Sequence, residues 1–372
     1  MSDRLKRLPG VDVIRGLCIF AVVIHHINLR IRFNKSPLGA ALPDWIHRIL
    51  FWNGSYSVKV FFVVSGFLIT STILARWKTQ TAIDLKGFYR LRAARIAPLL
   101  LAILAILSVL HLASAPGFTI NPTRASLPRA LIAALTFHVN WLEPRHGYLP
   151  GAWDVLWSLS VEEAFYLAYP LICRYVKRGW ILGVLALALM AAGPLFRTVW
   201  AFNEIDSDYG YLANLDCIAM GCATALLGGR IRAPRFVGPA LMMAVAFVKS
   251  GALARSGFDV TLLALGTALT LMSIRRNPAA GRWTSPLQWL GRNSYEVYLT
   301  HMFVVTTATQ IYTAMGTPIR WAFAWFVGIT VLSALLGDAV ARWYSEPLNR
   351  RLRGTRSSTT DQPALSRAVE TA

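Results

Sequence analysis

Charged residues are scarce in this sequence. Only 15% of its 372 residues are charged and 55% are hydrophobic, whereas soluble domains average about 25% charge. This composition excludes disorder for most of the chain, and it excludes a nucleic-acid-binding arm, because both require polar, charge-rich sequence. Acidic residues are the scarcest, since 18 Asp and Glu stand against 38 Lys and Arg, for a formal net charge of +20.

Cysteine is also rare. The four cysteines are Cys18, Cys173, Cys217 and Cys222. They are too few and too scattered for a disulfide framework, and the last two lie five residues apart within an apolar run, a spacing that fits no zinc motif. We therefore interpret them as small apolar side chains and expect no metal site.

Long apolar runs, by contrast, are abundant. A membrane-spanning helix needs about 20 mostly apolar residues. Ten runs qualify, centred on 11–29, 56–75, 97–114, 156–173, 180–198, 212–228, 236–253, 259–274, 291–313 and 321–343. The shorter apolar stretch 128–142 predicts an interfacial or re-entrant helix. The expected fold is an all-α, polytopic membrane helix bundle with about ten transmembrane helices.

The domain organisation follows from these runs. Residues 1–353 are expected to form one transmembrane domain, and the polar segment 354–372 a disordered cytoplasmic tail. No small-residue cleavage site follows the first apolar run, so we interpret 11–29 as a retained helix and not as a signal peptide.

The basic excess follows the predicted topology. With a cytoplasmic N-terminus, 25 of the 38 basic residues lie in inner loops or the tail. This asymmetry is typical of the positive-inside rule, so both termini are expected in the cytoplasm of a multi-pass plasma (bacterial inner) membrane protein. A nucleic-acid partner is not needed to explain the charge.

Ionisable residues inside the predicted helices are candidates for function, because a charge in hydrocarbon costs about 2.5–3.5 kcal/mol or more. At about 100° per residue, Arg15 and His26 fall within about 20° of one helix face, and Asp12 lies one turn before Arg15. His25 points about 100° away. Mutual neutralisation of Asp12 and Arg15 is the structural alternative for that pair.

Further polar pairs stand on later helices. Arg92 and Arg95 share a helix face at i,i+3, and guanidinium groups suit phosphates, although spacing alone favours ordinary positive-inside anchors. Glu162 and Glu163 are adjacent and point in different directions, so at most one enters a shared site. A polar stripe, Tyr295, Tyr298 and His301, follows near the C-terminus.

Together these residues resemble the integral-membrane acyltransferase 3 family over residues 8–350. Six of its motifs occur in order: Asp12-x-x-Arg15-Gly16 with His26, FFVVSGFLI (61–69), Arg92-x-x-Arg95-Ile-x-Pro98, WSLSVEEAFYL (157–167), LGRNSYEVYLTH (290–301) and SEPL (345–348). The fourth motif aligns Glu162 and not Glu163. Two positions depart from the family pattern: Lys59, where many members carry Asp, and Ala164, where Gln is common.

The resemblance implies transfer of an acyl group, commonly acetyl from acetyl-CoA, to a hydroxyl of a surface glycan. On this hypothesis His26 is the general base or a transient acyl carrier, and Glu162 orients His26 or binds the acceptor. Arg92 and Arg95 hold the phosphates of cytoplasmic acyl-CoA. The supporting residues are Asp12, Arg15, Ser65, Tyr298 and His301. The thioester is already activated, so no metal is required.

The expected function is therefore that of a membrane O-acyltransferase, most simply an O-acetyltransferase, with membrane lipid around it and a polysaccharide or lipid-linked glycan as acceptor. Some members carry a fused extracytoplasmic domain, whereas here we expect the membrane domain to act alone. One alternative is acylation of a small molecule such as a macrolide or nodulation factor. Another is a transporter or flippase for a lipid-linked sugar, although the paired repeats typical of transporters are missing from the sequence. The sequence does not identify the acceptor, the acyl-chain length, the oligomeric state or the role of 115–155.

Overall fold

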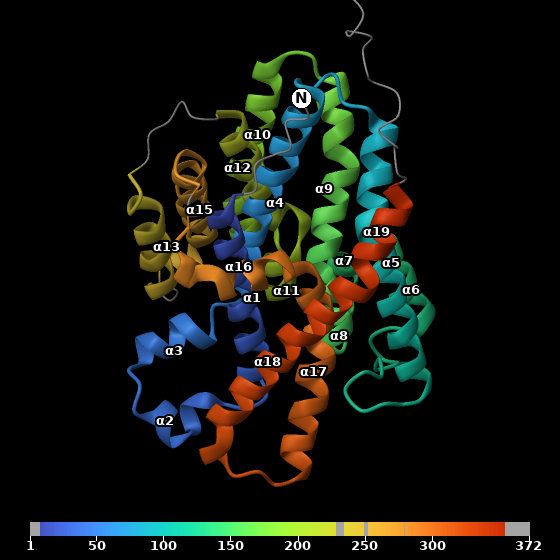
Figure 1. Ribbon diagram of the computed structural model, residues 1–372, viewed down its shortest axis with the longest axis vertical. Coiled ribbons are helices and arrows are strands. Elements are labelled where there is room, and N and C mark those ends of the chain that lie inside the picture. Colours follow the sequence, from blue (N-terminus) through green and yellow to red (C-terminus); the bar gives the residue numbers. More distant parts are fainter. Residues whose placement is uncertain (1–7, 228–233, 249–251, 279, 354–372) are drawn as a thin grey trace, which may run out of the picture.

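A computed structural model describes residues 8–227, 234–248, 252–278 and 280–353, and every regular element within them is helical. Most of the long helices run roughly parallel to one axis of the molecule (Figure 1). This confirms the prediction of an all-α, polytopic helix bundle.

Seven helical stretches in the described part of the chain are long and apolar enough to cross a membrane. They are α1 (Pro9–Asn28), α4 (Gly54–Trp77), α5 (Leu85–Leu112), α10 (Gly179–Leu195) with a π-helical turn to Trp200, α11 (Glu204–Tyr209) with α12 (Tyr211–Leu227), α15 (Phe258–Arg276), and α18 (Ala322–Val340) with α19 (Glu346–Arg353). At 1.5 Å per residue, a helix of 20 residues reaches about 30 Å, the thickness of the hydrocarbon layer.

Three of the ten predicted spans are not among these seven. Two are long helices, α9 (Leu156–Tyr175) and α17 (Ser294–Ala314), which carry several polar and ionisable side chains. The third is α13 (Val237–Phe247), which has 11 residues. The number of ten spans and the cytoplasmic position of both termini stay predictions.

The remaining helices are short. They are α2 (Pro37–Ala40), α3 (Asp44–Phe51), α6 (Leu127–Leu135), α7 (Val139–His146), α8 (Gly151–Asp154), α14 (Ala252–Arg255) and α16 (Ser285–Arg292). The apolar stretch 128–142, predicted as one helix, thus contains parts of two, α6 and α7. Phe137 lies between them with a φ of 58°, a left-handed conformation that cannot continue an α-helix.

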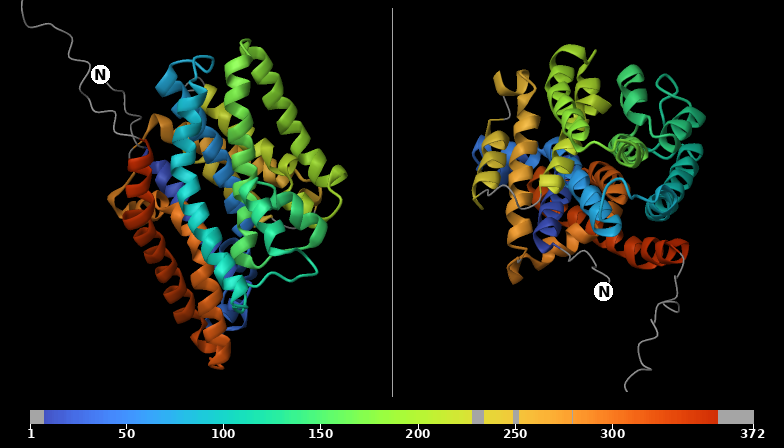
Figure 2. Two further views of the ribbon diagram at one scale, coloured as in Figure 1. Left: turned by 90° about the vertical axis from the view of Figure 1, so that its right-hand side faces the viewer. Right: turned by 90° about the horizontal axis from the view of Figure 1, so that it is seen from above.

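The centre of the bundle is α4. It packs against α1, α9, α12 and α15, and Figure 2 shows it surrounded by other helices when the molecule is seen from above. Large apolar side chains are exposed on the outer helices instead, for example Leu101 on α5, Leu187 on α10 and Leu332 on α18. An exposed apolar surface of this kind suits contact with lipid.

Glycines bring α1 and α16 into backbone contact. A Cβ atom on Gly291 would lie 1.8 Å from the carbonyl oxygen of Asp12, and one on Gly16 would lie 2.1 Å from that of Leu287. Small residues allow this kind of close helix packing in membrane proteins. The contact fixes the start of α1, and therefore Arg15, against the segment that leads into α17.

Candidate active site

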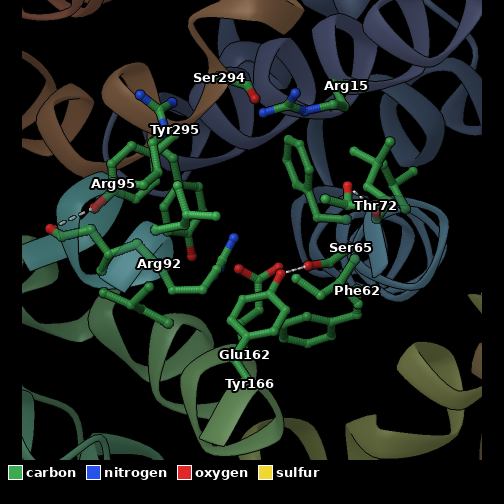
Figure 3. Close-up of a pocket in the computed structure, with 18 of the residues that line it drawn as sticks. Arg15, Phe62, Ser65, Thr72, Arg92, Arg95, Glu162, Tyr166, Ser294 and Tyr295 are labelled. Carbon is green, nitrogen blue, oxygen red and sulfur yellow. Dashed lines mark hydrogen bonds between the residues drawn. The ribbon is translucent and has the colours of Figure 1, made fainter. Parts of the chain in front are cut away.

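A cavity of about 430 Å³ opens between α1, α4, α5, α9 and α17. Several of the side chains that line it are shown in Figure 3. Its polar lining consists of Arg15, Ser65, Thr72, Arg76, Arg92, Arg95, Ser158, Glu162, Tyr166, Arg292, Ser294, Tyr295, Tyr298 and Arg353. Six of these are arginines and one is a carboxylate, so the cavity carries a strong positive charge and suits an anionic ligand.

Arg92, on α5, is held between α5 and α9. Its guanidinium forms an ion pair with Glu163 at 3.2 Å and lies 3.6 Å from the centre of the Tyr166 ring. Its Nε atom is buried and has no hydrogen-bond partner among the described residues. Arg92 is therefore well fixed, with one buried donor left unpaired.

Arg95 lies one turn further along α5 and joins it to α17. It forms two hydrogen bonds to Glu296, of 2.7 and 3.2 Å, and its guanidinium lies 4.8 Å from the centre of the Tyr295 ring. Glu296 is almost fully buried. The two-bond geometry is the strongest arrangement for an arginine and a carboxylate, so Arg95 forms a fixed wall of the cavity.

Glu162 faces Arg92 across the cavity (Figure 3). Its carboxylate accepts a hydrogen bond from Ser65 and interacts with the charges of Arg92 and Arg15. The Ser65 hydroxyl is also hydrogen-bonded to the Tyr166 hydroxyl. Ser65 can therefore accept from Tyr166 and donate to Glu162, an arrangement that holds this carboxylate in place.

The two histidines His26, on α1, and His301, on α17, form a pair. His301 Nδ1 lies 2.7 Å from the carbonyl oxygen of Tyr298, and His26 Nδ1 lies 2.9 Å from that of Val22. Because a carbonyl oxygen only accepts, both Nδ1 atoms of the neutral rings carry the proton. His301 Nε2 is then an acceptor, 3.3 Å from His26 Nδ1, and it shares the single Nδ1 proton of His26 with the carbonyl oxygen of Val22. His26 Nε2 is left with its lone pair and is the basic atom of the pair.

The cavity ends just short of this pair. Neither histidine lines it, and its lining nearest to them includes Tyr298 and Ser158, whose hydroxyls are 2.7 Å apart. The Tyr298 ring centre lies 5.9 Å from that of His301. The Tyr298–Ser158 hydrogen bond therefore stands between the cavity and the imidazoles.

Beyond His26, away from the cavity, lies a second polar cluster made of Arg30, Glu143, Asp154 and Tyr209, hereafter the outer cluster. Arg30 donates to the carbonyl oxygen of His26 at 3.0 Å, and its charge also acts on Asp154. Tyr209 donates to Asp154 at 3.1 Å. Burial raises the pKa of Asp154 to about 7, and burial together with the negative charge of Asp154 raises the pKa of Glu143 well above its usual value. Both carboxyl groups therefore bind a proton more tightly than exposed carboxyl groups do.

The structure divides the residues predicted from sequence between two places. Arg15, Ser65, Arg92, Arg95, Glu162 and Tyr298 all line the cavity, whereas His26 and His301 meet beyond it. Asp12 is buried at the start of α1, where its charge acts on Arg15. The neighbours of Glu162 are Ser65 and Arg92, and the neighbour of His26 is His301. His25 points elsewhere, since its Nδ1 atom lies 3.0 Å from the carbonyl oxygen of Phe51.

The structure shows partners for several polar residues to which the sequence assigned no role. Glu163 and Glu296 pair with the two motif arginines. Lys59, which departs from the family pattern, is buried and pairs with Asp208 at 2.8 Å, and it donates to Asn214. Only the burial of isolated charges hinted at such partners, because a charge within a helix bundle needs one.

The described residues contain no group of three His, Cys, Asp or Glu side chains arranged to hold a metal ion.

Comparison with known proteins identifies the family of this chain. The family model described as an acyltransferase domain matches residues 8–339. The O-acetyltransferase OatA of Staphylococcus aureus (strain NCTC 8325 / PS 47) is 23% identical over 379 residues, which covers 93% of this chain and 58% of that protein. The peptidoglycan O-acetyltransferase OatA of Listeria monocytogenes is 25% identical over 338 residues, which covers 82% of this chain and 50% of that protein.

A third relative, the putative peptidoglycan O-acetyltransferase YrhL of Bacillus subtilis, is 25% identical over 368 residues and covers 89% of this chain and 54% of that protein. The chain thus spans about half the length of the curated relatives it matches. No solved structure is a significant match. With a family model that covers most of the sequence, and with seven apolar helices long enough to cross a bilayer, this chain is a multi-pass membrane protein that belongs to the acyltransferase domain family.

Proposed function

We propose that the protein is a membrane O-acetyltransferase that moves an acetyl group from cytoplasmic acetyl-CoA to a hydroxyl of a cell-surface glycan. The observation that carries this proposal is the position of the His26–His301 pair. It stands between a cavity lined with arginines and the outer cluster of carboxyl and hydroxyl groups. Donor and acceptor thus approach one base from opposite sides.

The arginine-lined cavity is the proposed donor site. Its positive charge suits the phosphates of acyl-CoA, and Arg92 and Arg95 are fixed on its wall by Glu163 and Glu296. Glu162 and Arg15 flank the path along which the acyl-pantetheine arm extends.

The reaction follows from the protonation of the two rings. His26 Nε2 takes the proton of the acceptor hydroxyl while the hydroxyl oxygen attacks the thioester carbonyl carbon. The new C–O bond forms, the C–S bond breaks, and the imidazolium returns its proton to the leaving thiolate. His301 Nε2 accepts from His26 Nδ1–H and stabilises the positive charge in between. The step consumes no net proton, so the protein needs no proton channel for it.

The donor arm has some distance to cover. Arg15 and His26 are eleven residues apart on α1, or about 16 Å along the helix axis. The Tyr298–Ser158 hydrogen bond closes this path in the structure. Entry of the arm requires these two side chains to separate, so we assign Tyr298 the role of a positioning residue for the donor.

The acceptor belongs on the other side of His26, at the outer cluster. Carboxyl groups and tyrosine hydroxyls are common partners for sugar hydroxyls, because they accept and donate hydrogen bonds in a small space. Two of the relatives, the Listeria monocytogenes protein and the putative enzyme of Bacillus subtilis, are named as peptidoglycan O-acetyltransferases, which supports a glycan acceptor here.

The experiment uses the purified full chain in lipid nanodiscs with radiolabelled acetyl-CoA and a panel of acceptors: peptidoglycan fragments, other surface glycans and a macrolide. The proposal predicts label in an alkali-labile ester on a glycan. Ester formation on the macrolide alone would contradict the glycan acceptor. Movement of an acceptor across the bilayer without acetylation would contradict the enzyme function.

A further inference from the structure

Three of the cavity arginines lie at its cytoplasmic end, as the predicted topology has it, and they come from three separate helices. Arg76 lies in the last turn of α4, Arg292 ends α16 and Arg353 ends α19. All three line the same cavity and all three are exposed to solvent. We call them the rim arginines.

The rim arginines differ from Arg92 and Arg95 in their partners. The latter two are each paired with a glutamate of the protein. Within the described part of the chain, none of the rim arginines forms an ion pair with a carboxylate, and the contact of Arg76 is with the Trp77 ring, 5.7 Å away. Their guanidinium donors are thus available to a ligand.

The rim arginines also gather charge of one sign. The guanidinium of Arg353 experiences the positive charges of Arg76, Arg92 and Arg95. Like charges repel one another, and this repulsion destabilises the arrangement. Glu162 is the single carboxylate among the described lining residues. An anion with several charges, bound at the rim, would remove this repulsion.

We propose that Arg76, Arg292 and Arg353 bind the phosphorylated nucleotide end of the acyl donor, while its thioester arm extends past Arg92 and Arg95 toward His26. This inference rests on the proposed function, because it assigns a subsite to the proposed donor. It gives α19, which packs against α5, a role as one wall of the donor site.

Depth along the cavity supports this order. Trp77, next to Arg76, packs against Phe88, one turn before Arg92 on α5. On α17, which begins at Ser294 just after Arg292, Tyr295 contacts Arg95, and Tyr298 one turn later contacts His301. From the predicted cytoplasmic end, Arg76 and Arg292 therefore come first, then Arg92 and Arg95, and then Tyr298 near the histidines. A donor molecule with its negative charges at one end and its reactive thioester at the other matches this order of residues along the cavity.

A membrane phospholipid also offers a phosphate, and arginines near a bilayer commonly contact lipid headgroups. The rim arginines differ from such anchors because they face a cavity that they share with Arg92 and Arg95. The test separates these two sources of phosphate.

The experiment measures binding of CoA and of pantetheine to the purified full chain by isothermal titration calorimetry. It uses the wild type and the R76Q, R292Q and R353Q variants in nanodiscs made of phosphatidylcholine alone. R351Q is the matched control, since Arg351 also lies on α19 and is exposed but does not line the cavity. We expect each rim variant to bind CoA about tenfold more weakly, the loss of one charge-assisted hydrogen bond, and R351Q to match the wild type. Binding of pantetheine, which has no phosphate, should be the same in all five proteins.

Equal binding of CoA by the rim variants and R351Q would overturn the inference, and so would equal losses for CoA and pantetheine. A loss that occurs only when anionic lipid is added to the nanodiscs would assign the rim arginines to lipid and overturn it as well. If the wild type itself does not bind CoA, the donor in the proposed function is wrong, an outcome distinct from failure of the rim assignment.

Discussion

Replacement of His301 by Phe is the sharpest test of how His26 is supported. Phe fills a similar volume at a fully buried position, but it removes the nitrogen that lies 3.3 Å from His26 Nδ1. A hydrogen bond to a charged group contributes about 1.5–3 kcal/mol. Since 3.3 Å is long for such a bond, the lower value applies, and kcat should fall about tenfold. The KM for acetyl-CoA should not change, because His301 does not line the donor cavity.

The Gln variant at the same position distinguishes support of His26 from simple packing. Its amide oxygen can accept from His26 Nδ1–H, so H301Q should recover most of the rate lost in the Phe variant. The assay is initial-rate kinetics in nanodiscs, with thermal unfolding as a check on folding. Equal losses for the two variants would refute the argument, and so would a loss confined to KM.

Three further predictions concern stability and are measured by thermal unfolding in detergent. Glu296→Gln breaks a pair whose arginine is 26% exposed, so we expect a loss of about 1–2 kcal/mol. Glu346→Gln breaks an exposed pair and should cost less than about 0.5 kcal/mol. Equal losses of stability in these two variants would contradict a larger contribution from the buried pair. Gly291→Ala places a Cβ 1.8 Å from a carbonyl oxygen and should lower the stability by about 1–3 kcal/mol. In Gly179→Ala the new Cβ meets no neighbour within 4 Å, so this variant should show no such loss of stability. Because burial raises the pKa of Asp154 from 3.8 to about 7, the folded state binds its proton more tightly than the unfolded state. Stability should therefore be highest at low pH, fall as the pH rises from about 4 to about 7, and level off above that. Asp154→Asn should flatten this dependence, and an unchanged slope would show that another group controls it.

The sequence predicted the class of fold because its signals are local. Apolar run length identifies a helix that crosses a membrane, and the seven such stretches coincide with predicted runs. Helix ends were harder to place. The run predicted from residue 97 is the second half of α5, which begins at Leu85, because the arginine-rich segment before it is equally able to form a helix. Likewise the run predicted from residue 291 begins a new helix at Ser294, after α16 ends.

Within the site, the sequence could place a residue on a helix face but not choose the facing helix. Arg15 and His26 were predicted on one face of α1, and both face the region between α1 and α17. The partner of His26 lies 275 residues away, and that of Arg95 lies 201 residues away. No periodicity links such distant positions. For the same reason Glu162 was linked to His26 by hypothesis, whereas its neighbours are Ser65 and Arg92.

The convergence of the rim arginines could not be predicted from the sequence either. Arg76, Arg292 and Arg353 look in the sequence like ordinary basic residues at the inner ends of helices, as the positive-inside rule requires. Only the packing of α4, α16 and α19 around one cavity brings them together. The predicted topology accounts for their basic character, and the fold explains why three of them converge.

His26 is the proposed base that joins the proposed donor cavity to the acceptor side. The most direct measurement is single-turnover transfer of labelled acetyl from acetyl-CoA to the glycan acceptor by wild type, H26A and the control H25A. A general base contributes about 10²–10⁴-fold, so the rate of H26A should fall by at least about 100-fold with CoA binding intact, and H25A should retain transfer within a few-fold of wild type. Transfer by H26A at a rate near that of the wild type would contradict the role of His26 as the base.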